Sequence, residues 1–149
     1  MGERKFMDLA LKEARRASEE GEVPIGAVIV RDGKVIARGR NRIEKERDAT
    51  RHAEIIAIER ASKKLKNWRL TGCALYVTVE PCPMCASAAT LARVDRIVFG
   101  APDELFGACG TVFSIPQSGR LKHAPKIERG ERAAECRALV QEFFKSLRS

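Results

Sequence analysis

Two short motifs hold the residues with the clearest capacity for chemistry. His52-Ala53-Glu54 is the first, and Pro81-Cys82-Pro83-Met84-Cys85 is the second. Two cysteines three residues apart at the start of a helix lie on one face, and two thiolates with one imidazole suit a soft, tetrahedral ion such as zinc. Three protein ligands leave a fourth position for water, which is the arrangement of a catalytic site. We therefore predict a zinc centre held by His52, Cys82 and Cys85. Glu54, a hard carboxylate beside a soft donor set, is better suited to carry protons than to bind the metal.

Each motif alone has a simpler explanation. A Cys-x-x-Cys pair also occurs as a thioredoxin-like redox pair, as half of a structural metal site, or as two buried thiols. A single histidine is more often an ordinary interior or surface residue, and an acid at a helix start is favoured by the helix dipole. The combination is more specific, because one of only two histidines stands in His-x-Glu, thirty residues before Pro-Cys-x-x-Cys. Together the motifs are typical of zinc-dependent nucleobase deaminases.

Periodicity and turn signals predict the elements that position these motifs. Apolar residues recur at helical spacing from Phe6 to Ala17, and Gly21 is the expected stop. Asp32-Gly33 between two apolar runs predicts a hairpin, because both central residues of a type I′ turn need positive φ. The full prediction in chain order is a helix over 6–17, strands over 25–30 and 34–39, a polar loop over 41–49, a helix over about 52–64, a strand over 73–79, a helix over 83–93, a strand over 96–99, an edge strand over 126–128 and a helix from about 131.

The order of these elements predicts the architecture. A strand, a short helical crossover and a second strand imply parallel neighbours with a right-handed connection. We expect one three-layer α/β/α domain over residues 1–149, with helices on both faces of a mixed five-stranded sheet. Both motifs then open helices at the carboxyl ends of strands, where open α/β sheets build their sites. His52 and Glu54 diverge by about 200° on a helix body, so both reach one ion only beyond the helix end. Thr50 is the predicted cap.

Length and composition exclude several classes of protein. A chain of 149 residues, 44% hydrophobic and 32% charged, is a globular domain of ordinary size. The longest apolar stretch, over 23–30, is interrupted by Pro24 and Gly26, so we expect no membrane span. Because the first 20 residues are heavily charged, we expect no secretory signal in them. Five cysteines, an odd number, favour a reducing, cytoplasmic compartment. Those outside the metal motif are expected to be buried small hydrophobes: Cys73, Cys109 and Cys136.

The charge balance points to a class of partner. The chain carries 28 Lys and Arg against 20 Asp and Glu, a net charge of +8. Such an excess suits a polyanion, since phosphate neutralisation supplies much of nucleic-acid affinity, although a solvated surface gives the same number. For an active site already identified from its motifs, the basic residues between Arg120 and Arg148 favour a nucleic-acid substrate over a free nucleobase.

Nearly the whole chain resembles the bacterial tRNA-specific adenosine deaminases of the cytidine deaminase-like superfamily. Beyond the two motifs, the similar segments are 22–28, 39–42, 50–54, 75–85, 98–101, 107–110 and 142–145. The resemblance implies hydrolytic deamination of adenosine to inosine at the wobble position, position 34, of a tRNA anticodon. It also implies one zinc ion per subunit, binding of the anticodon stem-loop, a cytoplasmic location and a homodimer. The Ala-rich helix over 83–93 could pack closely against the second subunit.

The resemblance also assigns roles to individual residues. His52, Cys82 and Cys85 would hold zinc, and Glu54 would move the protons. Asn41 would bind the target nucleoside, Asp103 would lie near the substrate sugar, and main-chain groups at Ala53 and around Glu80 would contact the base edge or the oxyanion. A flipped nucleotide needs stacking and phosphate neutralisation. The candidates for those contacts are Phe143, Phe144, Lys145 and Arg148, together with Arg120, Lys122 and His123. We expect Phe143 in the core and Phe144 exposed, and His123 to contact phosphate or nothing.

Five residues depart from the family pattern without touching the metal set. They are Ala49, Arg51, Pro102, Leu105 and Phe106, and they affect loop shape and substrate fit. Two alternatives to tRNA editing remain. One is a deaminase of the same fold that acts on a free base or nucleoside, such as guanine or cytosine. The other is a non-catalytic zinc module that binds RNA, which would need a fourth ligand.

Overall fold

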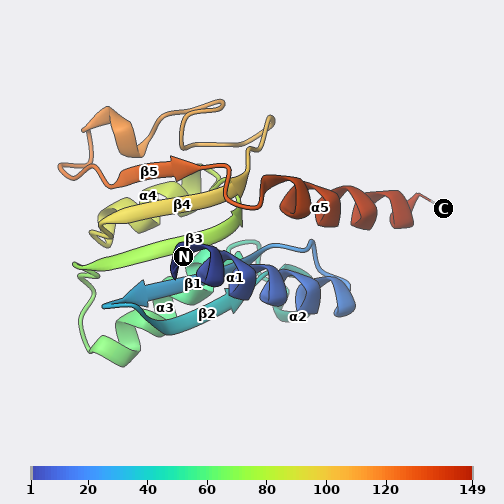
Figure 1. Ribbon diagram of the computed structural model, residues 1–149, viewed down its shortest axis with the longest axis horizontal. Coiled ribbons are helices and arrows are strands. Elements are labelled where there is room, and N and C mark those ends of the chain that lie inside the picture. The colour runs from blue at the N-terminus through green and yellow to red at the C-terminus, as the bar shows by residue number, and fades with distance from the viewer. Residues whose placement is uncertain (1, 149) are drawn as a thin grey trace.

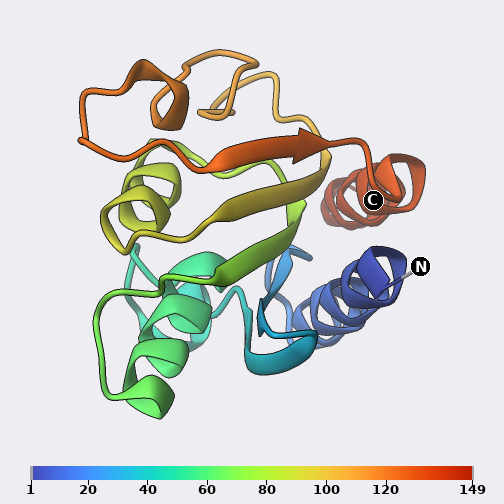
Figure 2. The same ribbon diagram turned by 60° about the vertical axis from the view of Figure 1, so that its left-hand side comes forward.

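A five-stranded mixed sheet lies between two layers of helices (Figures 1 and 2). The computed structural model describes residues 2–148. The strand order is β2-β1-β3-β4-β5, with β1 antiparallel to β2 and β3, and with β3, β4 and β5 parallel. The predicted architecture is therefore confirmed. In chain order the elements are α1 (Gly2–Glu19), β1 (Gly26–Arg31), β2 (Lys34–Arg40), α2 (Ile43–Glu46), α3 (Ala53–Leu65), β3 (Cys73–Val79), α4 (Pro83–Leu91), β4 (Arg96–Ala101), the 3₁₀ turn η1 (Pro116–Ser118), β5 (Lys126–Arg129) and α5 (Ala133–Leu147).

Local sequence explains the central strands. All seven residues of β3 are buried, as expected for an apolar run in the middle of a sheet covered on both faces. The turn between β1 and β2 has φ values of 51° at Asp32 and 75° at Gly33, which are the values that the predicted hairpin requires. The parallel pairing of β3 with β4 confirms the predicted strand-helix-strand unit.

The two faces of the sheet have separate cores. On one face, α3 and α4 pack through small residues, which let a helix approach the strands closely. Gly39 in β2 shows how close, because a Cβ atom there would lie 2.3 Å from the carbonyl oxygen of Ala53. On the other face, α1 covers Tyr76, and α5 contributes Cys136. The close packing at Gly39 fixes the first turn of α3, the helix that carries the His-x-Glu motif.

Three local predictions are wrong. Residues 41–49 contain the short helix α2, because the buried carboxylate of Glu22 accepts hydrogen bonds from the Glu44 and Lys45 amides at 3.1 and 2.9 Å. Thr50 does not cap α3, since its amide and hydroxyl both donate to Asp48. Phe143, expected in the core, is only half-buried: Cys136 is buried and Leu139 packs against the core, but α5 extends past the sheet edge and leaves Leu147 65% exposed (Figure 1). Over residues 2–148, no helix has the length and apolarity to cross a bilayer.

Candidate active site

The two sequence motifs meet because both lie at helix N-termini on the same face of the sheet. His52 is the N-cap residue of α3 and Cys82 is that of α4, both with extended backbone angles. Neither side chain makes a capping hydrogen bond. Cys85 lies in the first turn of α4, which Pro83 begins at the position where its missing amide hydrogen does no harm. The three side chains are therefore available to a ligand.

The separations of the donor atoms fit a tetrahedral metal ion. His52 Nδ1 lies 3.6 Å from Cys82 Sγ and 3.5 Å from Cys85 Sγ. All three donor atoms lie within 4.8 Å of one another. With the usual Zn–S and Zn–N bond lengths, two ligands at a tetrahedral angle stand about 3.6 Å apart. The predicted ligand set is thus brought together with the spacing that zinc requires, and the soft donors match that ion.

Glu54 lies beside this cluster and away from water. Its side chain is 4% exposed, and burial raises its pKa to about 7. His52 and Cys82 are close enough for their charges to act on it as well. A carboxyl group whose pKa lies near neutrality can accept a proton and return it at little cost. The position suits the proton-carrying role that the sequence predicts for Glu54.

The two thiols have opposite proton affinities. A hydrogen bond from Cys85 lowers the pKa of Cys82 to about 4, so that Cys82 is the thiolate of the pair. The same hydrogen bond raises the pKa of Cys85, which is the donor. The interaction with Cys82 also raises the pKa of His52. An ionised sulfur at a helix N-terminus is the state that a metal ligand needs.

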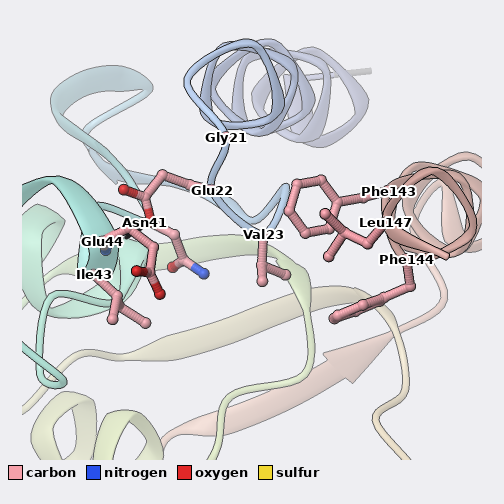
Figure 3. A pocket seen from close by; sticks show the side chains of 9 residues that line it. All are labelled: Gly21, Glu22, Val23, Asn41, Ile43, Glu44, Phe143, Phe144 and Leu147. Atoms are coloured by element: carbon pink, nitrogen blue, oxygen red, sulfur yellow. Dashed lines mark hydrogen bonds between the residues drawn. The ribbon is translucent and has the colours of Figure 1, made fainter. Parts of the chain in front are cut away.

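Asn41 joins the metal cluster to the adjacent pocket. Its side chain is 4% exposed, and its Oδ1 accepts a hydrogen bond from the Ala53 amide at 2.8 Å. Only the oxygen of the Asn41 side-chain amide can accept a hydrogen bond from a backbone N–H. This bond therefore fixes the orientation of the side chain and turns Nδ2 away from α3, toward the pocket (Figure 3). Asn41 therefore caps α3 from a distance and presents a hydrogen-bond donor to a ligand.

The pocket runs from Asn41 to the last turns of α5. It has a volume of about 330 Å³. Figure 3 shows its walls, which come from the segment after α1, from Asn41 and α2, and from α5. The lining residues are Gly21, Glu22, Val23, Asn41, Ile43, Glu44, Phe143, Phe144 and Leu147. Its size and mixed apolar and polar lining suit a nucleoside-sized ligand.

Two buried glutamates, Glu22 and Glu80, hold the segments around the pocket and the metal cluster in place, and the sequence predicts no role for either side chain. Glu22 holds α2 in place as one pocket wall. Glu80, 3% exposed, accepts hydrogen bonds from the amides of Asp103, Cys109 and Thr111 and from the Thr111 hydroxyl. It thereby ties the loop after β4 to the residues that precede Cys82. The one sequence signal for Glu80 is an acid directly after a largely apolar strand, where an unpaired charge would be costly.

Of the other residues predicted to contact substrate, some line the pocket and some lie outside it. Phe144 lines the pocket and is 44% exposed, as expected, whereas Phe143, expected in the core, is half-buried and lines the same pocket. Lys145 and Arg148 are exposed at the end of the same helix. Asp103 is partly exposed outside the pocket lining, and its Oδ1 accepts from the Leu105 and Phe106 amides at 2.9 and 3.1 Å.

Four expectations need correction. The Ala53 amide, expected to contact substrate, is occupied by Asn41. Arg120, Lys122 and His123 are not brought to the site, because their loop leads to the opposite, amino-terminal end of β5 (Figure 1). His123 bonds through Nε2 to the Val94 carbonyl oxygen at 2.8 Å and is thus a structural contact.

Two further expectations concern residues outside the substrate contacts. Arg51, one of the departures, forms salt bridges with Glu46 and Glu59. Cys73, Cys109 and Cys136 are buried as predicted.

A mixed sheet of this order, with a His-Cys-Cys cluster at two helix N-termini and a buried glutamate beside it, defines a cytidine deaminase-like protein. Comparison with known proteins agrees. The family model of the MafB19-like deaminases matches residues 1–148.

Individual relatives show to which family of deaminases the chain belongs. A tRNA-specific adenosine deaminase of Bacillus subtilis is 47% identical over 96% of this chain and 89% of its own. Another, of Aquifex aeolicus, is 44% identical over 100% of this chain and 98% of its own. A solved structure from work on A-to-I editing by tRNA:A34 deaminases has a TM-score of 0.88 at 46% identity and covers 91% of this chain and 98% of that one. The chain belongs to the tRNA-specific adenosine deaminase family.

Proposed function

We propose that the protein converts adenosine to inosine at the wobble position, position 34, of tRNA anticodons. The observation that carries this proposal is the joining of the His52, Cys82 and Cys85 cluster, through Asn41, to a nucleoside-sized pocket that ends on α5. Glu54 stands beside the cluster with its carboxyl group buried. The relatives named for adenosine deamination of tRNA support this substrate over others.

The reaction replaces the amino group at C6 of adenine with oxygen and releases ammonia. His52, Cys82 and Cys85 would hold one zinc ion, which when bound supplies a water of lowered pKa for attack at C6. Glu54 would take one proton from that water and deliver it to the ring nitrogen beside C6. It would then take the second proton from the hydroxyl now bonded to C6 and pass it to the amino group, which leaves as ammonia. Its burial in the metal cluster, apart from bulk water, supports this role.

Residues of the pocket would hold the flipped nucleotide. The Nδ2 group of Asn41 would donate to an acceptor on the base. The exposed ring of Phe144 would stack against a base, and Lys145 and Arg148 would neutralise phosphates. Asp103 would approach the sugar with Oδ2, since Oδ1 is engaged in the loop. Ala53 would act through Asn41, whose orientation its amide sets.

Sequencing of RNA products after incubation with total tRNA tests this function directly. Inosine reads as guanosine, so an A-to-G change confined to position 34 is the expected result. Glu54→Ala protein is the matched control: it should bind zinc and RNA and leave the adenosine unchanged. Absence of the change with wild-type protein, or its presence with Glu54→Ala, would contradict the assignment.

A deaminase of free bases is the second candidate. The supporting observation is a solved guanine deaminase of Bacillus subtilis, similar at 39% identity with a TM-score of 0.65 over 68% of this chain and 66% of that one. Turnover of free guanine, cytosine and adenosine should be compared with turnover of an anticodon stem-loop. Efficient use of a free base together with an untouched stem-loop would favour this candidate. A closed structural metal site has less support, since the metal-binding cluster that residues 2–148 form offers three ligands, His52, Cys82 and Cys85.

We further propose one domain over residues 1–149, a cytoplasmic location and a homodimer. The first rests on the single sheet whose two faces hold both cores, and the second on five cysteines that are all free. For the dimer, α4 presents a half-exposed Leu91, and the loop after β4 presents further apolar side chains: Leu105, Phe106, Val112 and Phe113. Light scattering of wild type and of Leu91→Glu tests this interface. We expect a dimer and a monomer, respectively.

A further inference from the structure

The end of the sheet opposite the active site carries an exposed aromatic and cationic surface. We define the Trp68 surface as Lys66, Trp68, Arg69 and Arg93. Trp68 is 55% exposed, although an indole is usually among the better buried side chains. The guanidinium of Arg69 lies 4.4 Å from the ring centroid, and that of Arg93 lies 6.0 Å away. Lys66 ends α3 next to them and is exposed.

The scaffold fixes this surface. The Leu70 amide donates to the Ala92 carbonyl at 2.7 Å, which ties the segment after α3 to the end of α4. Arg93 donates to the carbonyl oxygens of Thr90 and Leu91, at 3.4 and 3.1 Å. The indole and its cations are therefore held by ordered backbone on both sides.

The cations of the Trp68 surface lack acidic partners. Over residues 2–148, no carboxylate forms a salt bridge with Lys66, Arg69 or Arg93. Glu59, an acid of α3, is paired with Arg51 and Lys63 instead. Free positive charge around an exposed ring is the pattern by which proteins stack a base and neutralise its phosphates.

We propose that the Trp68 surface is a second RNA-binding surface, which contacts a part of the tRNA outside the nucleotide in the active site. It rests on the proposed function, because tRNA is its ligand. The length of β3 separates it from Cys82 by roughly 20 Å, so it contacts nucleotides several positions from the target. One unpaired base stacks on Trp68, and Lys66, Arg69 and Arg93 neutralise neighbouring phosphates. Lys122, exposed beside the His123 contact to Val94, extends the positive charge at the same end of the sheet.

The chain supplies its own probe, since Trp68 is its sole tryptophan. Zinc-loaded wild-type protein should be titrated with transcribed tRNA while tryptophan emission and the anisotropy of an end-labelled tRNA are recorded together. We expect emission to fall and to saturate at the same RNA concentration as the anisotropy. Free N-acetyltryptophanamide corrects for absorption by the RNA. If anisotropy saturates while emission stays constant, the Trp68 surface does not bind RNA. If anisotropy never changes, tRNA is not the ligand, and the proposed function fails with this inference.

Variants separate contact from folding. Trp68→Ala should weaken tRNA binding about fivefold or more, the smaller contribution of one base–aromatic stack, with kcat on saturating tRNA unchanged. Trp68→Phe should restore most of that affinity. Arg69→Ala should lower the slope of log affinity against log salt by about 0.7, one single-strand phosphate contact, and Lys12→Ala on the exposed side of α1 should not. Unchanged affinity in both Trp68→Ala and Arg69→Ala would overturn the proposal. So would an emission that depends on protein concentration without RNA, which would assign the surface to a second copy of the chain.

Discussion

Asn41 is expected to perform two separable tasks, and two substitutions distinguish them. Its Oδ1 caps α3 through the Ala53 amide at 2.8 Å, and its Nδ2 faces the pocket. Asn41→Ala removes both groups. Asn41→Asp keeps an oxygen for the Ala53 amide but replaces the donor that faces the pocket with an acceptor. The two variants should therefore differ in stability while both lose activity.

The magnitudes follow from burial. Asn41→Ala leaves a buried amide unpaired, and this should lower the free energy of unfolding by about 1–3 kcal/mol. For a chain of this length, that is a fall in melting temperature of roughly 2–12 °C. Asn41→Asp should melt within roughly 3 °C of wild type, since it retains the cap and places negative charge at a helix N-terminus. Its kcat/KM should fall about 100-fold or more, because an acceptor then meets an acceptor on the base.

Thermal denaturation followed by circular dichroism, at fixed protein and zinc concentrations, measures the first task. Initial rates of inosine formation on an anticodon stem-loop measure the second. If Asn41→Asp retains activity within about threefold, a change worth well under 1 kcal/mol, then Nδ2 makes no contact with the substrate. If Asn41→Ala melts with wild type, the hydrogen bond to Ala53 does not stabilise α3.

Three other predictions concern the cluster and its supports. Glu54→Gln should lower kcat by about 10²-fold or more with zinc content unchanged, as measured by single-turnover assay and metal analysis; full activity would remove Glu54 from proton transfer. Cys82→Ala, or removal of the metal by a chelator, should abolish bound zinc and lower the melting temperature, whereas full zinc occupancy in the variant would show that the ligand set is misassigned. Glu80→Gln should cost about 1–3 kcal/mol of stability, since its amide group meets donors, and should speed proteolysis of residues 102–113; an unchanged cleavage rate would contradict the role of Glu80 in holding that loop.

Local signals were sufficient for most of the fold and for the metal ligands. The hairpin follows from Asp32-Gly33, whose backbone angles only a few residue types adopt. His52, Cys82 and Cys85 could be brought together from sequence because strand-helix-strand topology places the two helix starts at one edge of the sheet. In both cases the information lies within a few residues, or within one supersecondary unit.

Long-range side-chain contacts could not be predicted in the same way. Nothing near Glu22 shows that its carboxylate holds the amides of residues 44 and 45, more than twenty positions away. Without that contact, residues 41–49 have the composition of a loop. Charge alone predicts Arg120 and Lys122 at the active site, where the structure does not place them. A strand parallel to β4 must start at its amino-terminal end, so the chain first carries these residues away from the site.

The N-terminus of α3 contains both a metal ligand that the sequence predicts and a long-range contact that it does not predict. An N-cap position ordinarily holds a small polar side chain that satisfies the first amides of the helix. In α3 and α4 that position holds His52 and Cys82, whose side chains are directed to a metal cluster instead. The amide of Ala53 then needs an acceptor from elsewhere, and Asn41 supplies it. A helix that begins with a residue unsuited to capping thus indicates both a functional group at its N-terminus and a remote polar residue that replaces the cap. That remote residue is fixed in orientation by the same bond, and this is why Asn41 has a defined donor to offer the substrate.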